Sequence, residues 1–194
     1  MRIDAGPQAI LEKSFVPPSR RAMAQPVLFI LSGLPGTGKT TLARALAAAW
    51  GATHLRIDTI EQALRDLCNL VVEGEGYRLA YRLAADNLRL GQCVVADSCN
   101  PIALTRREWE QVAIDCKTRF VNIEVVCSDP AEHRRRIESR RSDIATLKLP
   151  SWQDVIAREY EPWSVARVTF DTANQTSSEL IDRLRLDGSG LTHR

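Results

Sequence analysis

The sequence lacks the long apolar runs and the strong charge of one sign that mark membrane and nucleic-acid-binding proteins. No apolar run approaches the ~20 residues that span a bilayer, and none near the start forms the ~7–15-residue core of a secretory signal. The 194 residues carry a formal net charge of only +2, so no global field favours a nucleic acid or a membrane surface. The composition therefore predicts an ordinary globular protein.

Cysteine and histidine are present but too scattered to build a disulfide framework or a zinc site. The five cysteines include no C-x-x-C pair, and His54 and His133 stand without metal-ligand spacing. Unpaired cysteines in apolar segments behave as small hydrophobic residues. We therefore expect free thiols, a reducing cytoplasmic location and no role for either histidine.

The strongest positive signal lies in residues 27–41, VLFILSGLPGTGKTT. The apolar run suits a strand that is buried on both faces, and the residues after the motif are strong helix formers. Between the two, residues 33–40 match G-x-x-x-x-G-K-[ST], the phosphate-binding loop. The predicted nucleotide-binding residues are Gly33, Leu34, Pro35, Gly36, Thr37, Gly38, Lys39, Thr40 and Thr41.

The chemistry of this loop is specific. Its glycines allow successive backbone N–H groups to point at one anion, and the following helix presents its positive end to the same anion. Lys39 can reach the β- and γ-phosphates, and the Thr40 hydroxyl can ligate Mg²⁺. The loop therefore predicts binding of ATP with Mg²⁺.

Strands alternate with helices along the rest of the chain, which predicts parallel βαβ units and a sheet covered on both faces. We expect a P-loop NTPase fold, a three-layer α/β/α domain with a five-stranded parallel sheet. The domain is expected over residues 26–187, between an N-terminal extension (1–25) and a C-terminal tail (188–194). The expected strands are 27–31, 52–58, 93–96, 119–127 and 167–171, and a helix is expected over 151–160.

Acidic residues follow three of the predicted strands. Asp58, Asp97 and Asp171 each stand at a strand end, and in parallel sheets ligands collect at that edge. Asp58 is placed to accept the proton of a substrate hydroxyl, although it could instead cap the following helix. Asp97 follows an apolar strand, as acids that support Mg²⁺ do, with a plain turn residue as the alternative.

A densely basic segment, HRRRIESRR, occupies residues 133–141. Arg136 and Arg140 are four residues apart, so on a helix they share one face. A planar, permanently charged guanidinium suits the spread charge of a phosphoryl-transfer transition state. We predict a catalytic arginine here, favouring these two, and the alternative is a solvated charged face.

The order of these segments resembles a family. The phosphate loop, Asp58, the segment VVADSCNPIALTRREWEQVA and then VVCSDPAEHRRRIESRR look like the small P-loop kinases related to polynucleotide kinase, zeta toxin and chloramphenicol phosphotransferase. The resemblance covers about residues 27–186. It implies that Asp58 is the hydroxyl-activating base, that Asp97 belongs to the site, and that residues 134–152 form a helical lid over ATP. It also places residues 171–174 near the adenine.

The sequence departs from this family at one place. Polynucleotide kinases of this pattern carry D-x-x-R, whereas this chain has Glu61 at the arginine position and Arg65 one turn further on. The departure disfavours a phosphorylated nucleic-acid substrate and favours a neutral or cationic hydroxyl compound. Tyr77 and Tyr81 could flank this acceptor or pack in the core, and Asn100 could assist Asp97, contact substrate or cap the next helix.

The leading hypothesis is an ATP-dependent kinase that phosphorylates a hydroxyl of a small molecule. Asp58 would be the base, while Lys39, Mg²⁺, Arg136 and Arg140 would stabilise the transferring group. The alternatives are a 5′-hydroxyl polynucleotide kinase and a regulatory ATPase without a small-molecule acceptor. A membrane partner is not expected.

Overall fold

The computed structural model describes residues 25–186, so the predicted extension and tail lie almost entirely outside the described residues. Five parallel strands form one sheet in the spatial order β2-β3-β1-β4-β5. The strands are β1 (Val27–Ser32), β2 (Thr53–Arg56), β3 (Val94–Asp97), β4 (Arg119–Val126) and β5 (Val168–Asp171). The predicted P-loop NTPase fold with its five-stranded parallel sheet is confirmed.

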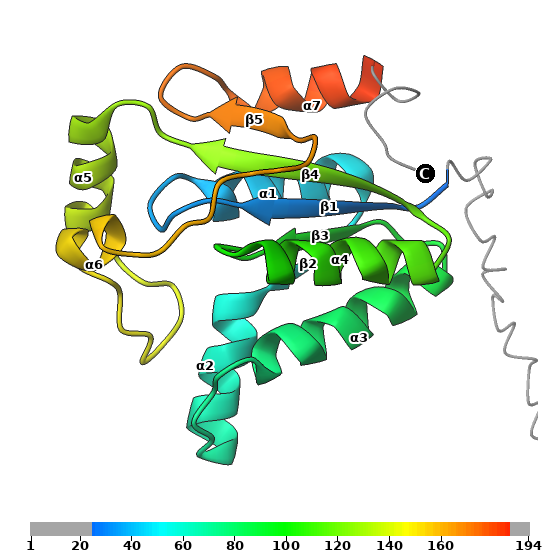
Figure 1. Cartoon of the computed structure of the whole chain (residues 1–194), viewed down its shortest axis with the longest axis horizontal. Coiled ribbons are helices and arrows are strands. Elements are labelled where there is room, and N and C mark those ends of the chain that lie inside the picture. The colour runs from blue at the N-terminus through cyan, green and yellow to red at the C-terminus, as the bar shows by residue number, and fades with distance from the viewer. Residues whose placement is uncertain (1–24, 187–194) are drawn as a thin grey trace, which may run out of the picture.

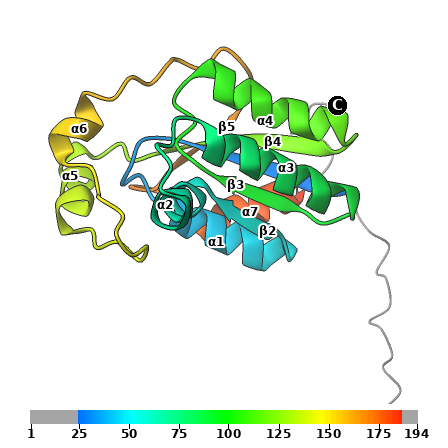
Figure 2. The ribbon, with the colours of Figure 1, turned by 90° about the horizontal axis from the view of Figure 1, so that it is seen from below.

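Helices follow the strands and cover both faces of the sheet (Figure 1). They are α1 (Lys39–Trp50), α2 (Ile57–Cys68), α3 (Glu75–Arg89), α4 (Ala103–Asp115), α5 (Pro130–Ser139), α6 (Trp152–Ile156) and α7 (Ser177–Leu186). In the view from below, α5 and α6 stand beyond the end of the sheet and α2 projects between them and the body (Figure 2). Within the described part of the chain, no helix is long and apolar enough to cross a membrane.

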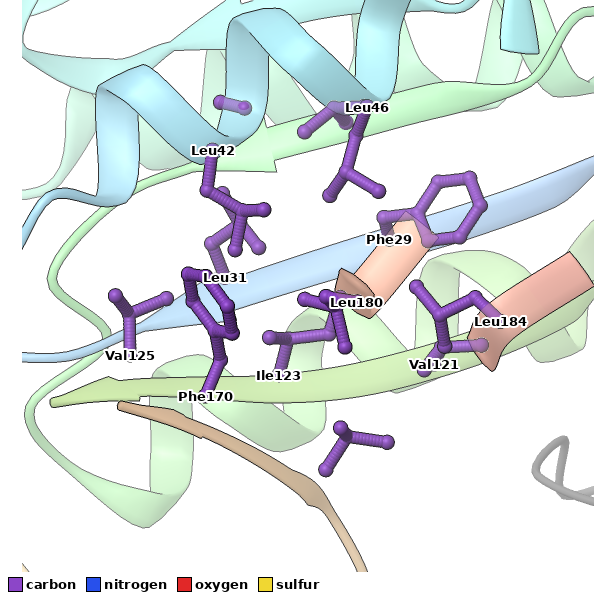
Figure 3. Close-up of a cluster of buried hydrophobic side chains, with 13 residues drawn as sticks. Phe29, Leu31, Leu42, Leu46, Val121, Ile123, Val125, Phe170, Leu180 and Leu184 are labelled. Atoms are coloured by element: carbon purple, nitrogen blue, oxygen red, sulfur yellow. The ribbon is translucent and has the colours of Figure 1, made fainter. Parts of the chain in front are cut away.

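Strand β1 lies at the centre of the sheet and buries side chains on both faces, as its apolar sequence predicts. Phe29 and Leu31 face one cluster, which includes residues of α1, β4, β5 and α7 (Figure 3). Leu28 and Ile30 face the other cluster, with residues of α3 and α4. The two packed layers fix the end of β1, from which the phosphate-binding loop emerges.

Two predicted element boundaries are wrong at the edge of the sheet that bears the site. The strand expected over 52–58 ends at Arg56, so Asp58 lies in the first turn of α2, where a carboxylate is stabilised by the helix dipole. It does not cap this helix, because Arg56 is the N-cap residue. The helix expected over 151–160 ends at Ile156, and the chain then passes from α6 toward the near end of α4 (Figure 2).

Candidate active site

The loop of residues 33–38 turns from β1 directly into α1, which begins at Lys39. Gly33 and Gly38 have φ of 140° and 96°, in the region that favours glycine. A Cβ on Gly33 would stand 2.2 Å from the Val125 carbonyl oxygen, so glycine is required there for space as well. This geometry turns the loop backbone around the start of α1, as the motif predicts.

Three contacts from other segments brace this loop. The Gly33 amide donates to the Cys99 carbonyl at 3.0 Å, and the Thr172 hydroxyl donates to the Thr37 carbonyl at 2.9 Å. His133 lies buried on α5 with its Nε2 2.8 Å from the Pro35 carbonyl oxygen. His133 therefore has a structural role that the sequence did not predict, since only the fold brings α5 against the loop.

The buried Lys39 side chain lies within the loop, where its Nζ donates to the Leu34 carbonyl at 2.8 Å. The Thr37 hydroxyl donates to the same carbonyl at 2.9 Å. Both groups hold the loop in its turned shape. The ammonium group is thereby placed next to the start of α1, where the helix dipole also attracts an anion.

A cleft of about 790 Å³ opens above the loop. It brings together most of the predicted site residues: Pro35, Gly36, Gly38, Lys39, Thr40, Thr41, Asp58, Asp97, Arg136 and Arg140. Gly33, Leu34 and Thr37 do not line the cleft and instead shape the loop from behind. The volume lies within the range of small-molecule sites.

Asp171 ends β5, as predicted, but it does not line the cleft. Its carboxylate accepts hydrogen bonds from the Ser128 amide and from Asn174 Nδ2. Burial opposes ionisation of Asp171, yet these hydrogen bonds hold its pKa at about 2. Asp171 therefore organises the loop after β5 and is the one strand-end acid that stays outside the cleft.

Asp97 is buried at the end of β3, with Oδ2 3.0 Å from Nε2 of His54. His54 lies on the neighbouring strand β2, so the register of the two strands creates this contact. The sequence predicted no role for His54, because the pairing of β2 with β3 is not visible in a local pattern. The histidine fixes the orientation of the carboxylate toward the cleft.

The donors in this cleft fit a magnesium ion that is shared with a nucleotide. Within residues 25–186, no group of three or more His, Cys, Asp or Glu side chains could hold a metal alone. Thr40 and Asp97 both line the cleft, and Mg²⁺ is usually bound through one or two protein oxygens together with phosphates and water. Thr40 and Asp97 are the residues that would hold it.

Arg136 and Arg140 both line the cleft, but the prediction that they share one helical face is wrong, because α5 ends at Ser139 and Arg140 is its C-cap. Arg136 is held by Glu132 at 2.7 Å and by the Thr172 hydroxyl at 2.7 Å. Arg140 follows the end of α5, and its side chain forms no hydrogen bond or ion pair with the described residues. Arg136 is thus fixed in the wall of the cleft, whereas Arg140 is free to meet a ligand.

Glu61 stands on α2 one turn beyond Asp58, and its carboxylate accepts from Arg65 at 3.1 Å. Its side chain packs so closely on α3 that a Cβ on Gly76 would come within 2.3 Å of Glu61 Cγ. Burial raises the pKa of Glu61, although the Arg65 guanidinium opposes this shift. Glu61 is therefore already engaged, which argues against its expected role as an acceptor of hydrogen bonds from substrate.

The segment of residues 140–150, which we call the lid segment, crosses from α5 to the far side of the cleft. Asp143 is gripped there by Arg44 of α1 and by Arg56 of β2, with Arg56 Nη1 at 2.8 Å. Burial opposes the ionisation of Asp143, but its hydrogen bonds from Arg56 and Arg44 are stronger and hold its pKa well below its usual value. These charges are dispersed in the sequence, so no local pattern predicts their contact.

The lid segment is also tied to α2. The Thr146 hydroxyl donates to Asp66 Oδ2 at 2.6 Å, and Gln62 Nε2 donates to the Thr146 hydroxyl at 2.9 Å. Gln62 is buried in this contact. The segment therefore closes the cleft on the side of α2, as a lid would.

Arg106 of α4 fixes the remaining wall of the cleft. Its buried guanidinium donates to the Asn100 carbonyl at 2.9 Å and to the Glu161 carbonyl at 2.8 Å. It also stacks over the rings of Tyr160 and Trp163, with centroid distances of 4.9 and 4.3 Å. Arg106 thus joins the loop after β3 to the chain after α6, a role that no local pattern predicts.

The aromatic and amide residues considered for the acceptor prove to be structural. Tyr77 and Tyr81 pack on the core that contains Trp109, with Tyr81 edge-on to Trp109 at 4.6 Å. Burial raises the pKa of both tyrosines. Asn100 is fully buried and donates from Nδ2 to the Leu31 carbonyl at 2.7 Å, so it neither caps α4 nor contacts Asp97.

The loop, the strand order and the cleft define a P-loop nucleotide-binding protein. Residues 28–162 match the family described as AAA domain. This match spans well over half of the sequence, and the chain belongs to that family. No curated protein matches the chain significantly.

Solved structures with the same fold include small P-loop kinases. A proposed kinase from Chloroflexus aurantiacus gives a TM-score of 0.67 at 23% identity, covering 88% of this chain and 100% of that one. Kti12 from Chaetomium thermophilum, solved with ADP-AlF3, has a TM-score of 0.63 at 22% identity, and the match covers 84% of this chain and 100% of that one. APS kinase CysC from Mycobacterium tuberculosis, solved with AMPPNP and APS, has a TM-score of 0.61 at 16% identity, and the match covers 83% of this chain and 96% of that one.

Proposed function

We propose that this protein is an ATP-dependent kinase that transfers the γ-phosphoryl group to a hydroxyl of a small molecule. One observation carries the proposal: a carboxylate, Asp58, lines the same cleft as the phosphate loop and the free Arg140. Phosphoryl transfer needs a phosphate cradle, a group that orients or deprotonates the nucleophile, and cations for the developing charge. The nucleotide complexes of Kti12 and of the APS kinase support a nucleotide at this loop.

The transfer follows from these positions. Asp58 accepts the proton of the acceptor hydroxyl while the hydroxyl oxygen attacks the γ-phosphorus. The bond from phosphorus to the bridging oxygen breaks, and ADP leaves. Lys39 stabilises the β- and γ-phosphates, and Mg²⁺ bound at Thr40 and Asp97 supplies further charge neutralisation when present.

Arg140 is the better candidate for the arginine that meets the transferring group. The Arg136 guanidinium already donates hydrogen bonds to Glu132 and Thr172, so we assign Arg136 to holding α5 against the loop after β5. Arg140 begins the lid segment, so docking of Asp143 fixes the chain three residues away. Lid docking also excludes water, which suppresses wasteful hydrolysis of ATP.

The direct test is Asp58→Asn, an isosteric change that removes the base. We expect kcat to fall by about 10²–10⁴-fold, the usual contribution of general base catalysis, while ATP affinity stays within about two-fold. Asp182→Asn, on the exposed surface of α7, is the matched control and should leave kcat unchanged. Full activity in Asp58→Asn would show that the base is misassigned.

The same assay separates the two alternatives. Phosphorylated acceptor is counted by mass shift against ATP consumed, over a panel of hydroxyl compounds. ATP consumption without any phosphorylated product would favour a regulatory ATPase. Transfer to 5′-hydroxyl oligonucleotides, with affinity that falls steeply as salt rises, would favour a polynucleotide kinase.

A further inference from the structure

We propose that the acceptor is a small anion, a hydroxyl compound that also bears a carboxylate, phosphate or sulfate group held by Lys148 and Arg158. This inference rests on the proposed kinase function and specifies its substrate class. The site is the outer half of the cleft, which we define by Arg65 of α2, Cys99 of the loop after β3, Lys148 of the lid segment and Arg158.

The charge of the cleft is the first argument. Seven cationic side chains line it against three acidic ones, Asp58, Glu61 and Asp97. Arg65, Arg135 and Arg136 are paired with Glu61 or Glu132, so the lining cations without an ion pair among the described residues are Lys39, Arg140, Lys148 and Arg158. The cations nearest the phosphate loop on α1 and α5 meet the nucleotide, which leaves those of the outer half for a second anion.

The position of Arg158 is the second argument. The chain after α6 is pinned to the loop after β3, because the Glu161 amide donates to the Pro101 carbonyl at 2.8 Å. Arg106 binds the Glu161 carbonyl as well, so this stretch has little freedom. Arg158 stands three residues before Glu161 and lines the cleft, as does Cys99 of the loop after β3.

Lys148 comes to this wall from the lid segment, two residues after Thr146 docks on α2. Lys148 and Arg158 both lie near Asp154: its pKa is lowered mainly by Ser151 and also by these two cations. The Asp154 carboxylate is engaged in a capping box with Ser151 and does not line the cleft. Neither cation forms a hydrogen bond or ion pair within the described part of the chain, so both can turn to a ligand.

Glu61 does not oppose such a ligand. Its charge is compensated by Arg65 at 3.1 Å, and its side chain is packed against Gly76. Asp58 thus remains as the one acid that faces the acceptor without a compensating partner, and this is the residue proposed to receive the hydroxyl proton. The arrangement fits a molecule with a hydroxyl at one end and an anionic group at the other.

The lid segment favours a small acceptor over a polymer. The contact of Thr146 with Gln62 and Asp66 closes the cleft along α2, which narrows the way in for an extended polymer. The cleft of about 790 Å³ must also hold the nucleotide. The remaining space suits a compact molecule rather than an extended chain.

A binding experiment tests the anion site without requiring turnover. The protein is saturated with Mg²⁺ and AMPPNP to fill the phosphate loop, and inorganic sulfate is then titrated by calorimetry. We expect one further sulfate to bind, and its affinity to fall at least ten-fold in the double variant Lys148→Ala/Arg158→Ala. Arg107→Ala, an exposed arginine on α4 outside the cleft, is the control and should bind as the unaltered protein does.

Unchanged sulfate affinity in the double variant, or no sulfate binding to the AMPPNP complex, overturns the proposal. Activity then tests the substrate class with matched pairs, such as glycerol and glycerol 3-phosphate, or a sugar and its aldonic acid. We expect kcat/KM to be at least ten-fold higher for the anionic member and this preference to vanish in the double variant. ATP affinity should stay constant.

The outcomes separate the two levels of the proposal. Preference for the neutral member of each pair overturns the anionic acceptor while the kinase function stands. ATP hydrolysis without transfer to any acceptor overturns the kinase function, and the sulfate titration still decides the anion site. Competition of sulfate by a 5′-hydroxyl oligonucleotide, lost as salt is raised, overturns the choice of a small acceptor.

Discussion

The phosphate half of the cleft, formed by residues 35–41, and the outer half defined above differ in what holds them in place. Backbone geometry shapes the phosphate half, through glycines at positive φ and contacts to the loop carbonyls. Side chains from α2, the lid segment and the chain after α6 shape the outer half. A backbone cradle accepts any triphosphate, whereas converging side chains can be changed one by one, so the outer half is where specificity resides.

The largest effect is expected from Gly33→Ala, which breaks the phosphate half. The new methyl group meets the Val125 carbonyl at 2.2 Å in a backbone region that alanine avoids. We expect a loss of about 3 kcal/mol or more in the free energy of unfolding, together with loss of nucleotide binding. Chemical denaturation measures the free energy of unfolding, and titration with a fluorescent nucleotide measures the affinity.

Gly51→Ala is the matched control for this prediction. Gly51 also has positive φ, 60°, but nothing lies within 4 Å of the position of its Cβ. We expect a cost of about 1 kcal/mol and normal nucleotide affinity. Equal losses in the two variants would mean that the close approach at Gly33 is unimportant.

The next effect is expected in the wall of the outer half, from Arg106→Met. The change keeps much of the apolar volume but leaves the Asn100 and Glu161 carbonyls without their buried donor. We expect a loss of about 3 kcal/mol in unfolding free energy and a larger rise in the acceptor KM than in the ATP KM. Denaturation and steady-state kinetics measure these, with exposed Arg107→Met as the control expected within about 0.5 kcal/mol.

A smaller effect is expected from Asp143→Asn, which weakens the docking of the lid segment. The substitution removes the charge that Arg44 and Arg56 share, so we expect a several-fold higher KM for ATP and faster proteolysis within residues 140–150. Global stability should change by less than about 1 kcal/mol, since the carboxylate is half exposed. A change in unfolding free energy without a change in proteolysis would contradict this assignment.

The same contact has a defined pH dependence. The folded-state pKa of Asp143 lies below the ordinary value of 3.8, so its docking contribution is complete above that value. As pH falls below about 4 toward the depressed folded-state pKa, protonation removes it. Limited proteolysis between pH 3 and pH 7 should therefore show lid release only at the acidic end, and Asp143→Asn should abolish that dependence.

The smallest effect is expected from Tyr81→Phe, which tests whether this tyrosine belongs to the outer half. Its hydroxyl donates to Glu108 at 2.9 Å, away from the cleft, and its ring packs on Trp109. We expect a loss of about 0.5–1.5 kcal/mol in unfolding free energy and less than a two-fold change in acceptor KM. A large change in the acceptor KM would indicate that Tyr81 contacts the acceptor after all.

The sequence predicted the phosphate half well because that half is encoded locally. The glycines, Lys39 and Thr40 stand in one sequence motif at the start of α1. The parallel sheet also followed from the alternation of apolar strands with helices. These predictions needed no knowledge of which distant segments meet.

The outer half could not be predicted because its contacts join residues far apart in the chain. Asp143 meets Arg44 across 99 residues, and Thr146 meets Gln62 across 84. The structural role of Glu61 could not be predicted either, since its pairing with Arg65 and its packing on Gly76 depend on how α2 lies against α3. Only the tertiary arrangement turns these scattered charges into one surface.

The bracing of the phosphate loop by Cys99, His133 and Thr172 bears on the timing of the catalytic cycle. These contacts come from the protein itself, so we expect little conformational entropy to be lost in the loop on association. Capture of the triphosphate should then be fast and product escape comparatively slow, governed by the opening of residues 140–150. We expect kcat to depend more on solvent viscosity and on substitutions within residues 140–150 than on substitutions that alter the phosphoryl-transfer step.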